Sequence, residues 1–366
     1  MLKEQRALNT YSKESDEPMS HQWLTAALSK PLGEAIPALC ECTFLEELVE
    51  RNPQWEEAFF RKVINALDDA FEGDHPQALG EIHRALFSLY ELHVTDGTSA
   101  RAVNQFNPTL TRVRSRIERA WLAREERRAR ASGAALNSTA IVPTLKDLWA
   151  RHPVSSHPLF DFLEKDASRE QIVAFFKSDS ALNIRFFDLL LYSMIGSREG
   201  VRRELAQNLW DEAGRGEAAR AHVSLFQHLL EVVGVGRAPD HHASELGWEG
   251  LAGHNLFMLA CVNRQHYFKL LGVMAMTELL DPSQYEKLAR GCRRVGLGGA
   301  NELEYYDEHV TIDVIHGEGW LSNVIEPILH DTPEVGADIL LGAVLRMATC
   351  KDYYDALYAR LNGMRR

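Results

Sequence analysis

Apolar residues recur at intervals of three and four positions along most of this chain, and this period restricts its fold more than any other feature. The pattern is clear over residues 34–52 and 54–72, and it continues to about residue 362 in segments joined by short turns that contain Gly or Pro. Such a period is typical of amphipathic helices, whereas strands alternate apolar and polar residues. No set of alternating strands and no repeat of fixed length is present. The sequence therefore predicts an all-α fold, a helical bundle with an additional helical N-terminal region.

A small, polar segment divides the helical pattern into two parts. Residues 132–144, SGAALNSTAIVPT, have the composition of a linker. We therefore expect a helical N-terminal region over 1–131, a linker over 132–144 and a helical bundle over 145–366. Within the bundle, the pattern predicts one helix over about 250–280 and the next over about 282–295, with a turn before Pro282.

The charge balance limits the classes of partner. The chain has 40 Lys and Arg against 52 Asp and Glu, a formal net charge of −12, which argues against a general nucleic-acid binder. Some of the excess carboxylates are available as ligands of a cation. The helix expected over about 108–131 is the exception, because it holds eight arginines against three glutamates. It is either a patch for phosphate or an acidic partner or, as we favour, a solvated face or oligomer contact.

Cysteine usage and hydropathy indicate a soluble, cytoplasmic protein. The five cysteines are odd in number and include no CxxC pair, so a disulfide framework or a zinc ribbon is not expected. The first 20 residues lack the apolar core of a signal peptide, and no run of about 20 uncharged apolar residues occurs. We expect no membrane partner.

The sharpest chemical motif is His309-x3-Asp313-x2-His316 in EYYDEHVTIDVIHGEGW. On a helix, positions i, i+4 and i+7 project within about 60° of one another, so two imidazoles and a carboxylate share one face. That donor set suits iron, manganese or zinc. The alternative is an exposed helix edge that carries three polar residues.

A second motif is NLWDEAGRG followed by a histidine six residues later. An apolar helix ends at Glu212, two glycines break it, and His222 begins the next amphipathic run. Ten residues are too many for one helical face, but a break at the glycines would bring both side chains to one point. In the alternative interpretation the glycines form a helix C-cap, and both polar residues lie on the surface.

A third element is Glu278 in the apolar segment GVMAMTELLDP. An ionised glutamate that faces a core is costly unless it is paired or bound to a metal. If Glu278 marks an exposed face near the helix end, it needs no such explanation.

Together, these motifs resemble the heme-oxygenase-like diiron oxygenases, all-helical proteins often described as iron-containing redox enzymes. The stretch from about His157 to Leu329 is similar to their catalytic bundle. The resemblance implies a site for two iron ions that uses O2 as co-substrate, with six ligands: Glu212, His222, Glu278, His309, Asp313 and His316. Some members have an additional carboxylate on the first core helix. Asp188 is the candidate for that position, although a surface role for it is the interpretation we favour.

The resemblance also implies an activity. We expect a non-heme diiron oxygenase of natural-product biosynthesis that oxidises the nitrogen of a small amine, guanidine or amino-heterocycle to a hydroxylamine or nitro group, with an external electron donor. One alternative at the same metal site is oxidative C–C cleavage, decarboxylation or desaturation of an amino or fatty acid. Another is a non-catalytic helical protein that binds iron or a partner. Residues 1–131 resemble an extension that contributes to a dimer in longer members, so we expect a homodimer.

Two other classes of iron protein fit the motifs less well. Ferritin-like sites need two Glu-x-x-His pairs on facing helices, and this chain has one such match, Glu72 to His75, within a turn. Heme oxygenase itself needs an axial histidine and room for a porphyrin, and four ligands from other helices would crowd that space.

Residues near the motifs are candidates for the wall of a substrate pocket. Five aromatic residues are candidates on this ground, although such residues more often belong to the core: Tyr305, Tyr306, Trp210, Phe226 and Trp320. Three polar residues are candidates to meet a substrate carboxylate: Arg185, Asn263 and Arg264.

Overall fold

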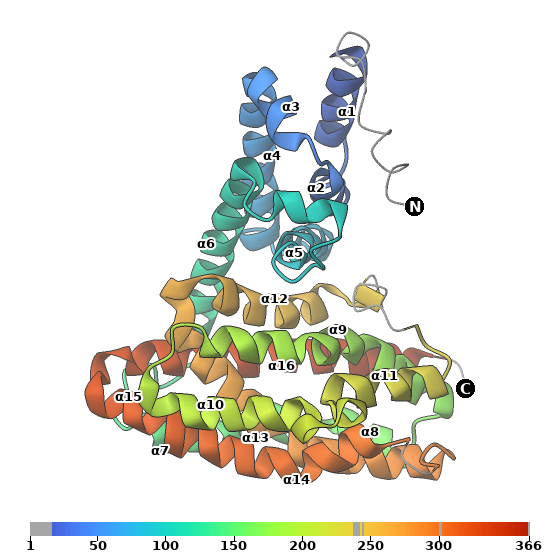
Figure 1. Ribbon diagram of the computed structural model, residues 1–366, viewed down its shortest axis with the longest axis vertical. Coiled ribbons are helices and arrows are strands. Elements are labelled where there is room, and N and C mark those ends of the chain that lie inside the picture. Colours follow the sequence, from blue (N-terminus) through green and yellow to red (C-terminus); the bar gives the residue numbers. More distant parts are fainter. Residues whose placement is uncertain (1–16, 237–241, 244, 300–301, 365–366) are drawn as a thin grey trace. The chain divides into compact units, whose positions relative to one another are not determined.

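The computed structural model describes residues 17–236, 242–243, 245–299 and 302–364, which form helices and turns without a β-strand (Figure 1). The all-α prediction is therefore confirmed for these residues. The chain divides into two compact units, Met1–Trp121 and Leu122–Arg366. Residues 1–16 of the predicted N-terminal region lie outside the described part.

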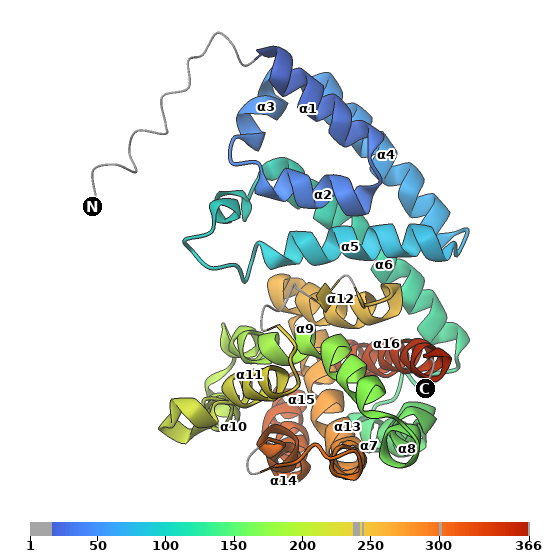
Figure 2. The same ribbon diagram turned by 90° about the vertical axis from the view of Figure 1, so that its right-hand side faces the viewer.

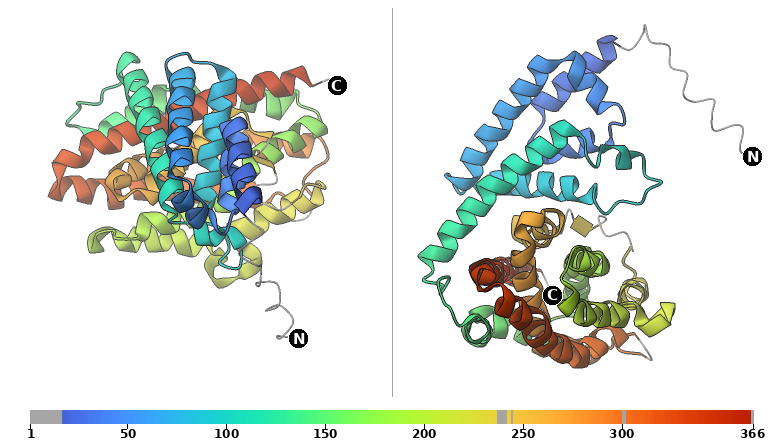
Figure 3. Two further views of the ribbon diagram at one scale, coloured as in Figure 1. Left: turned by 90° about the horizontal axis from the view of Figure 1, so that it is seen from above. Right: turned by 60° about the vertical axis from the view of Figure 1, so that its left-hand side comes forward.

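Among its described residues, the first unit contains five α-helices and the first half of a sixth, shown from two further sides in Figure 3. Their bounds are α1 (Glu17–Ser29), α2 (Leu32–Glu41), α3 (Leu45–Arg51), α4 (Pro53–Phe71), α5 (Pro76–Glu91) and α6 (Pro108–Ala131). Helix α5 packs on α2 and α4. Ile36, Phe59 and Ile82 from these three helices are completely buried. The periodic apolar residues therefore supply one shared core.

The second unit contains the rest of α6 and ten further helices. They are α7 (Ile141–Arg151), α8 (Pro158–Lys165), α9 (Arg169–Met194), α10 (Glu199–Glu212), α11 (His222–Val232), α12 (Trp248–Val262), α13 (Tyr267–Arg294), α14 (Glu304–Gly319), α15 (Glu326–Asp331) and α16 (Gly336–Gly363). Helix α13 lies between α14 and α16, and α8 also packs on it (Figure 2). Its central place explains why no residue of its first half, 267–280, is exposed.

Helices α13 and α16 run in the same direction and meet at their backbones. Gly272 of α13 lies against Ile339 of α16, and Gly342 of α16 lies against Lys269 of α13. A Cβ atom at either glycine would overlap a carbonyl oxygen of the other helix. The two glycines therefore permit an approach that larger residues would prevent.

Helices α13 and α14 run in opposite directions. Near one end, the rings of Tyr285 and Tyr306 pack with centroids 4.9 Å apart. Toward the other end, Glu278 Oε2 lies 3.5 Å from His316 Nδ1. After α14, a single π-helical segment, Trp320–Ile325, leads into α15. Such segments are uncommon and are often found at functional sites.

The sequence prediction for residues 250–295 is wrong about where the helices divide. The break lies at Asn263, whose backbone is extended and whose side-chain amide donates to the Leu259 carbonyl at 2.9 Å. Pro282 lies inside α13 and does not end it. A proline removes the hydrogen bond to the carbonyl four residues earlier, here that of Glu278, and its ring crowds that carbonyl. The packing of α13 on α14 and α16 holds the helix together across this gap.

The boundary between the two units falls inside α6, before the linker expected over 132–144. Residues 132–140 form turns, but α7 begins at Ile141, so the last part of the expected linker is helical. Arg128 Nη2 in the last turns of α6 lies 2.9 Å from Asp352 Oδ2 of α16. Helix α6 is uninterrupted and contributes residues to both units. Its composition therefore does not mark the boundary between them.

Two further observations concern the hydropathy of the helices and the state of the cysteines. No helix among the described residues combines the length and the apolar character that crossing a bilayer requires. All five cysteines are buried as free thiols, and burial raises the pKa of Cys40 and Cys292 to about 12.

The close contact of α13 and α16 predicts the effect of a single methyl group. We expect Gly342→Ala to lower the free energy of unfolding by about 1–3 kcal/mol, because its Cβ would overlap the Lys269 carbonyl. The matched control is Gly200→Ala on α10, where a Cβ meets nothing within 4 Å and helix propensity improves. Urea unfolding measures both variants. Equal stabilities for the two would contradict the close contact.

Candidate metal centre

The first part of the site forms where α10 gives way to α11. Glu212 is the last residue of α10, and His222 is the first residue of α11. Between them Gly214, Arg215 and Gly216 have φ angles of 71°, 54° and 92°. A Cβ at Gly214 would overlap the backbone at Ala221, so the turn needs glycine there. This turn brings His222 Nδ1 to 3.0 Å from Glu212 Oε1.

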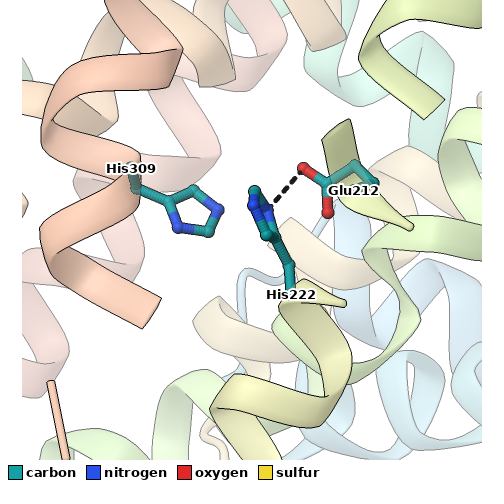
Figure 4. A group of neighbouring side chains, drawn as sticks. All are labelled: Glu212, His222 and His309. Carbon is teal, nitrogen blue, oxygen red and sulfur yellow. Dashed lines mark ion pairs between the residues drawn. The ribbon is translucent and has the colours of Figure 1, made fainter. Parts of the chain in front are cut away.

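A third side chain completes this cluster from α14. The imidazole of His309 lies with its centroid 4.3 Å from that of His222 (Figure 4). Glu212, His222 and His309, here called the first group, each offer a ligand atom within 4.8 Å of the others. All three residues are buried.

A second cluster lies where α13 faces α14. Glu278, Asp313 and His316, here called the second group, also offer ligand atoms within 4.8 Å of one another. Each residue is at most 4% exposed. Glu278 therefore faces the interior, and its carboxylate lies among polar partners.

The structure brings all six sequence-predicted ligands into these two groups. The predicted face of α14 is shared between them, because His309 joins the first group while Asp313 and His316 join the second. Asp188 is in neither group. Its side chain is 38% exposed and lies 3.5 Å from Arg185 Nη1.

Each of the three histidines has a hydrogen-bond acceptor beside one ring nitrogen. This contact fixes the orientation of the ring and therefore the direction in which the second ring nitrogen points. His316 Nε2 lies 3.2 Å from Asp211 Oδ2, and His222 Nε2 lies 3.4 Å from Glu308 Oε2. His309 Nδ1 donates to its own helix, to the Tyr305 carbonyl at 2.6 Å. The nitrogens left for a metal are thus Nδ1 of His222 and His316 and Nε2 of His309.

Sequence reasoning missed the two outer carboxylates, Asp211 and Glu308. Each directly precedes a candidate ligand in the sequence, Glu212 and His309 respectively. Adjacent helical residues point in different directions, so this proximity gave no sign of a shared site. Asp211 is itself held by Arg215 Nε at 2.6 Å.

The donor atoms fit a metal. Nδ1 of His222 and Nδ1 of His316 are buried and have no hydrogen bond of acceptable geometry, although each lies near a carboxylate oxygen. A buried nitrogen without a hydrogen bond is costly, and coordination to a cation would satisfy it. Three carboxylates and three imidazoles are donors that suit iron or manganese.

The two histidines with outer carboxylates are protonated at neutral pH in the metal-free chain. Burial alone would lower the pKa of His222, but Glu212 and Glu308 raise it to about 9. Burial likewise opposes the charge of His316, and Glu278 and Asp211 raise its pKa to about 9. Each raised pKa reflects negative charge that a metal ion would otherwise balance.

The pKa values of His309 and Asp313 are also shifted, because buried charged groups lie close to them. Burial and then the positive charge of His222 lower the pKa of His309 to about 4. Burial and the negative charges of Glu278, Asp281 and Glu212 raise the pKa of Asp313 well above its usual range. Carboxyl groups this close do not all ionise unless a cation is present.

A cavity adjoins both groups. Its walls come from α9, α10, α12, α13, α14 and α16 and from the segment just before α12, and they include Glu212, Glu278, His309 and Asp313. The cavity has a volume of about 50 Å³, which has room for a small polar group or a few water molecules. Of the five aromatic candidates, Tyr305 lines this cavity, whereas none of the three polar candidates does. The cavity instead presents Asp179, Asp281 and Arg346, which sequence reasoning did not select.

Comparison with known proteins relates this region to a family. Residues 173–350, which include all six candidate ligands, match the model of a family described as iron-containing redox enzymes. The match covers α10, α11, α12, α13 and α14 completely, most of α9 and about half of α16, so both groups lie within the region that is similar to this family.

Two further comparisons do not assign a function. No curated protein matches the chain. The crystal structure of a CADD-like protein of unknown function from Nostoc punctiforme is similar with 19% sequence identity and a TM-score of 0.44, over 60% of this chain and 96% of that chain.

The raised histidine pKa values predict that metal binding releases protons. At pH 7.5, His222 and His316 carry protons that a metal must displace, so we expect at least about two protons per chain on Fe(II) loading and weaker binding as the pH falls. Anaerobic calorimetry in buffers of different ionisation enthalpy measures this number. His330→Ala, which removes a side chain that is 89% exposed, is the control and should release the same number. Heats that do not depend on the buffer would contradict the assignment.

Proposed function

We propose that the second unit is a non-heme diiron oxygenase that oxidises the nitrogen of a small amine, guanidine or amino-heterocycle. The observation that carries this proposal is the pair of three-residue groups, each built from buried carboxylates and imidazoles and both facing one cavity. The match of residues 173–350 to the iron-containing redox enzymes supports iron as the metal and oxidation–reduction as the chemistry.

The six residues have distinct tasks in this proposal. The first and second groups would each hold one iron ion, and the pair would supply the two electrons that dioxygen activation requires. Glu212, Glu278 and Asp313 supply negative charge that balances the ions. Asp211 and Glu308 hold the rings of His316 and His222 in the orientation that exposes Nδ1.

Outer contacts fix this arrangement further. Arg220 at the turn before α11 is bonded to Glu308, so the carboxylate that positions His222 is itself anchored. The indole of Trp320 donates to Asn208 Oδ1 at 3.0 Å and ties the π-helical segment after α14 to α10. These contacts hold α10, α11 and α14 together, and an external electron donor would restore the reduced state after each turnover.

The cavity supports a polar substrate. Besides the metal groups, it is lined by the phenol rings of Tyr285, Tyr305, Tyr353 and Tyr354 and by further carboxylates. A fatty acid would need room for its long tail, which a cavity of about 50 Å³ does not provide. The second candidate is therefore the oxidation of a small amino acid by C–C cleavage or desaturation at the same site. The role of residues 1–131 in a homodimer stays a prediction.

Iron loading tests the metal centre. We expect about two Fe(II) ions per chain after anaerobic loading, and at most about one in His309→Ala or Asp313→Ala, because each variant removes a ligand from one group. His330→Ala is the control, since this histidine lies outside both groups. Less than one iron in the native chain, or unchanged loading in the two ligand variants, would overturn the diiron proposal.

The cavity itself can be tested without changing a ligand. Gly253 of α12 lines the cavity, and a Cβ there meets nothing within 4 Å. We expect Gly253→Leu to keep its iron but to lose at least about tenfold in product formation, because the side chain would occupy the space that the substrate needs. Gly200→Leu, on the exposed start of α10, is the control.

Product formation is measured by mass spectrometry of a panel of small amines, guanidines and amino acids incubated with the Fe(II)-loaded chain and oxygen. A product that gains oxygen on nitrogen supports the proposal, and carbon loss or a new alkene supports the second candidate. Turnover in Gly253→Leu equal to that of the control would show that this cavity is not the substrate site.

A further inference from the structure

The cavity beside the metal groups holds charged side chains that neither group uses. They are Asp179 of α9, Asp281 of α13 and Arg346 of α16, so three different helices bring them together. Arg346 is only 6% exposed, whereas both aspartates keep part of their surface open. These aspartates lie deep in the bundle, so the open surface faces the cavity. A substrate role for the three side chains rests on one part of the proposed function, namely that this cavity is the substrate site.

Existing contacts hold two of the three side chains, Asp179 and Arg346, in place. Asn183 Nδ2 donates to Asp179 Oδ2 at 2.8 Å, one turn further along α9. Arg346 Nε donates to Thr277 Oγ1 at 2.9 Å, and its guanidinium lies over the Phe257 ring, 5.0 Å from the centroid. Neither contact brings a second cation to the aspartates.

The guanidinium of Arg346 acts electrostatically on both carboxyl groups. The cavity also contains His254, but burial and then the charge of Arg185 lower its pKa to about 3, so it stays neutral. If two iron ions balance the candidate ligands and both aspartates are ionised, the wall beyond the ligands has an excess of one negative charge. Without a second cation, protonation of an aspartate removes this excess. A buried carboxylate without a counter-charge is unfavourable.

The pKa values of both aspartates show this shortage of positive charge. Burial raises the pKa of Asp179 to about 6, even though Asn183 and Arg346 oppose the rise. Burial raises the pKa of Asp281 well above its usual range, and the negative charges of Asp179 and Glu278 add to the effect against Arg346. A second cation between the carboxylates would reverse both shifts.

We propose that the cavity binds its substrate through a cationic nitrogen group, an ammonium or a guanidinium, held between Asp179 and Asp281. One such charge completes the balance, because two carboxylates then face two cations. A substrate carboxylate at this place would add a third negative charge and is excluded. An anchored ammonium has no free lone pair, so the atom that is oxidised belongs to another part of the molecule.

A matched pair of small molecules tests the anchor. Butylguanidinium and butylurea have nearly the same shape, but only the first is charged, and the urea has a carbonyl oxygen in place of one NH2 group. We expect the full-length, metal-free chain to bind butylguanidinium at least about tenfold more tightly than butylurea in calorimetric titrations, and more tightly than butyrate. Equal affinities for the charged and neutral molecules, or tighter binding of butyrate, would overturn the proposal. This comparison needs no variant.

Three variants then locate the binding site. Asp179→Asn and Asp281→Asn keep the side-chain shape and remove one charge, so each should lose at least about tenfold in affinity for butylguanidinium and little for butylurea. Asp188→Asn, on α9 but outside the cavity, is the matched control and should behave as the native chain does. Unchanged selectivity in both cavity variants, or an equal loss in the control, would contradict the anchor. Circular dichroism checks that each variant is folded.

The anchor and the metal centre can fail separately. Butylguanidinium binding is measured without iron, and its selectivity should persist in His309→Ala, which is designed to impair iron loading. If iron loading fails in the native chain while cation selectivity is intact, the diiron proposal falls and the anchor stands. If iron loads as expected but the charged and neutral molecules bind equally, the anchor alone is wrong.

Discussion

The pairing of carboxylates with imidazoles inside a helical bundle is the interaction on which the rest of the second unit depends. Six ionisable side chains lie in the interior, where an unpaired charge is costly. Every imidazole has an acceptor on the nitrogen turned away from its group, supplied by Asp211, Glu308 or the Tyr305 carbonyl. These contacts can form only if α10, α11, α13 and α14 meet at fixed positions. The burial of the site therefore constrains the packing of four helices.

Backbone features make that meeting possible. Positive φ angles between α10 and α11 let a chain segment of ten residues return Glu212 to His222, and Gly214 provides the space for the approach. The glycine contacts between α13 and α16 place Thr277 against Arg346 one turn later, at the wall of the cavity. The same close crossing thus supports the fold and the position of a charged group beside the candidate metal centre.

Net charge was a poor guide to these arrangements. The value of −12 argued against nucleic acid, but it did not locate the carboxylates that matter. The positive charge of helix α6 was an equally poor guide, because some of its arginines are paired within the chain. Arg124 and Arg128 are paired with Glu125, and Arg128 is also paired with Asp352. Local pairing decides what a charge does, and pairing between distant segments cannot be counted from composition.

Several features of the site followed from the sequence because they depend on local geometry. The spacing of His309, Asp313 and His316 on one helix, and the glycine break after Glu212, needed only the helical period and the freedom of glycine. The helical period alone could not show which aspartate of α9 faces the cavity. Asp188 lies beside Arg185 at the surface, whereas Asp179, nine residues earlier, reaches the cavity. Which acid faces inward depends on the rotation of α9 against its neighbours.

The sequence alone thus determined that the chain is helical, that its second part resembles an iron-containing redox enzyme, and which six side chains are the candidate ligands. It placed the domain boundary and the division near Pro282 differently from the structure, because helix continuity there depends on packing rather than on composition. Only the tertiary structure divided the six residues into two groups, selected the ring nitrogens and lined a cavity with Asp179, Asp281 and Arg346. These outcomes arise from contacts between helices far apart in the chain, which no local period encodes.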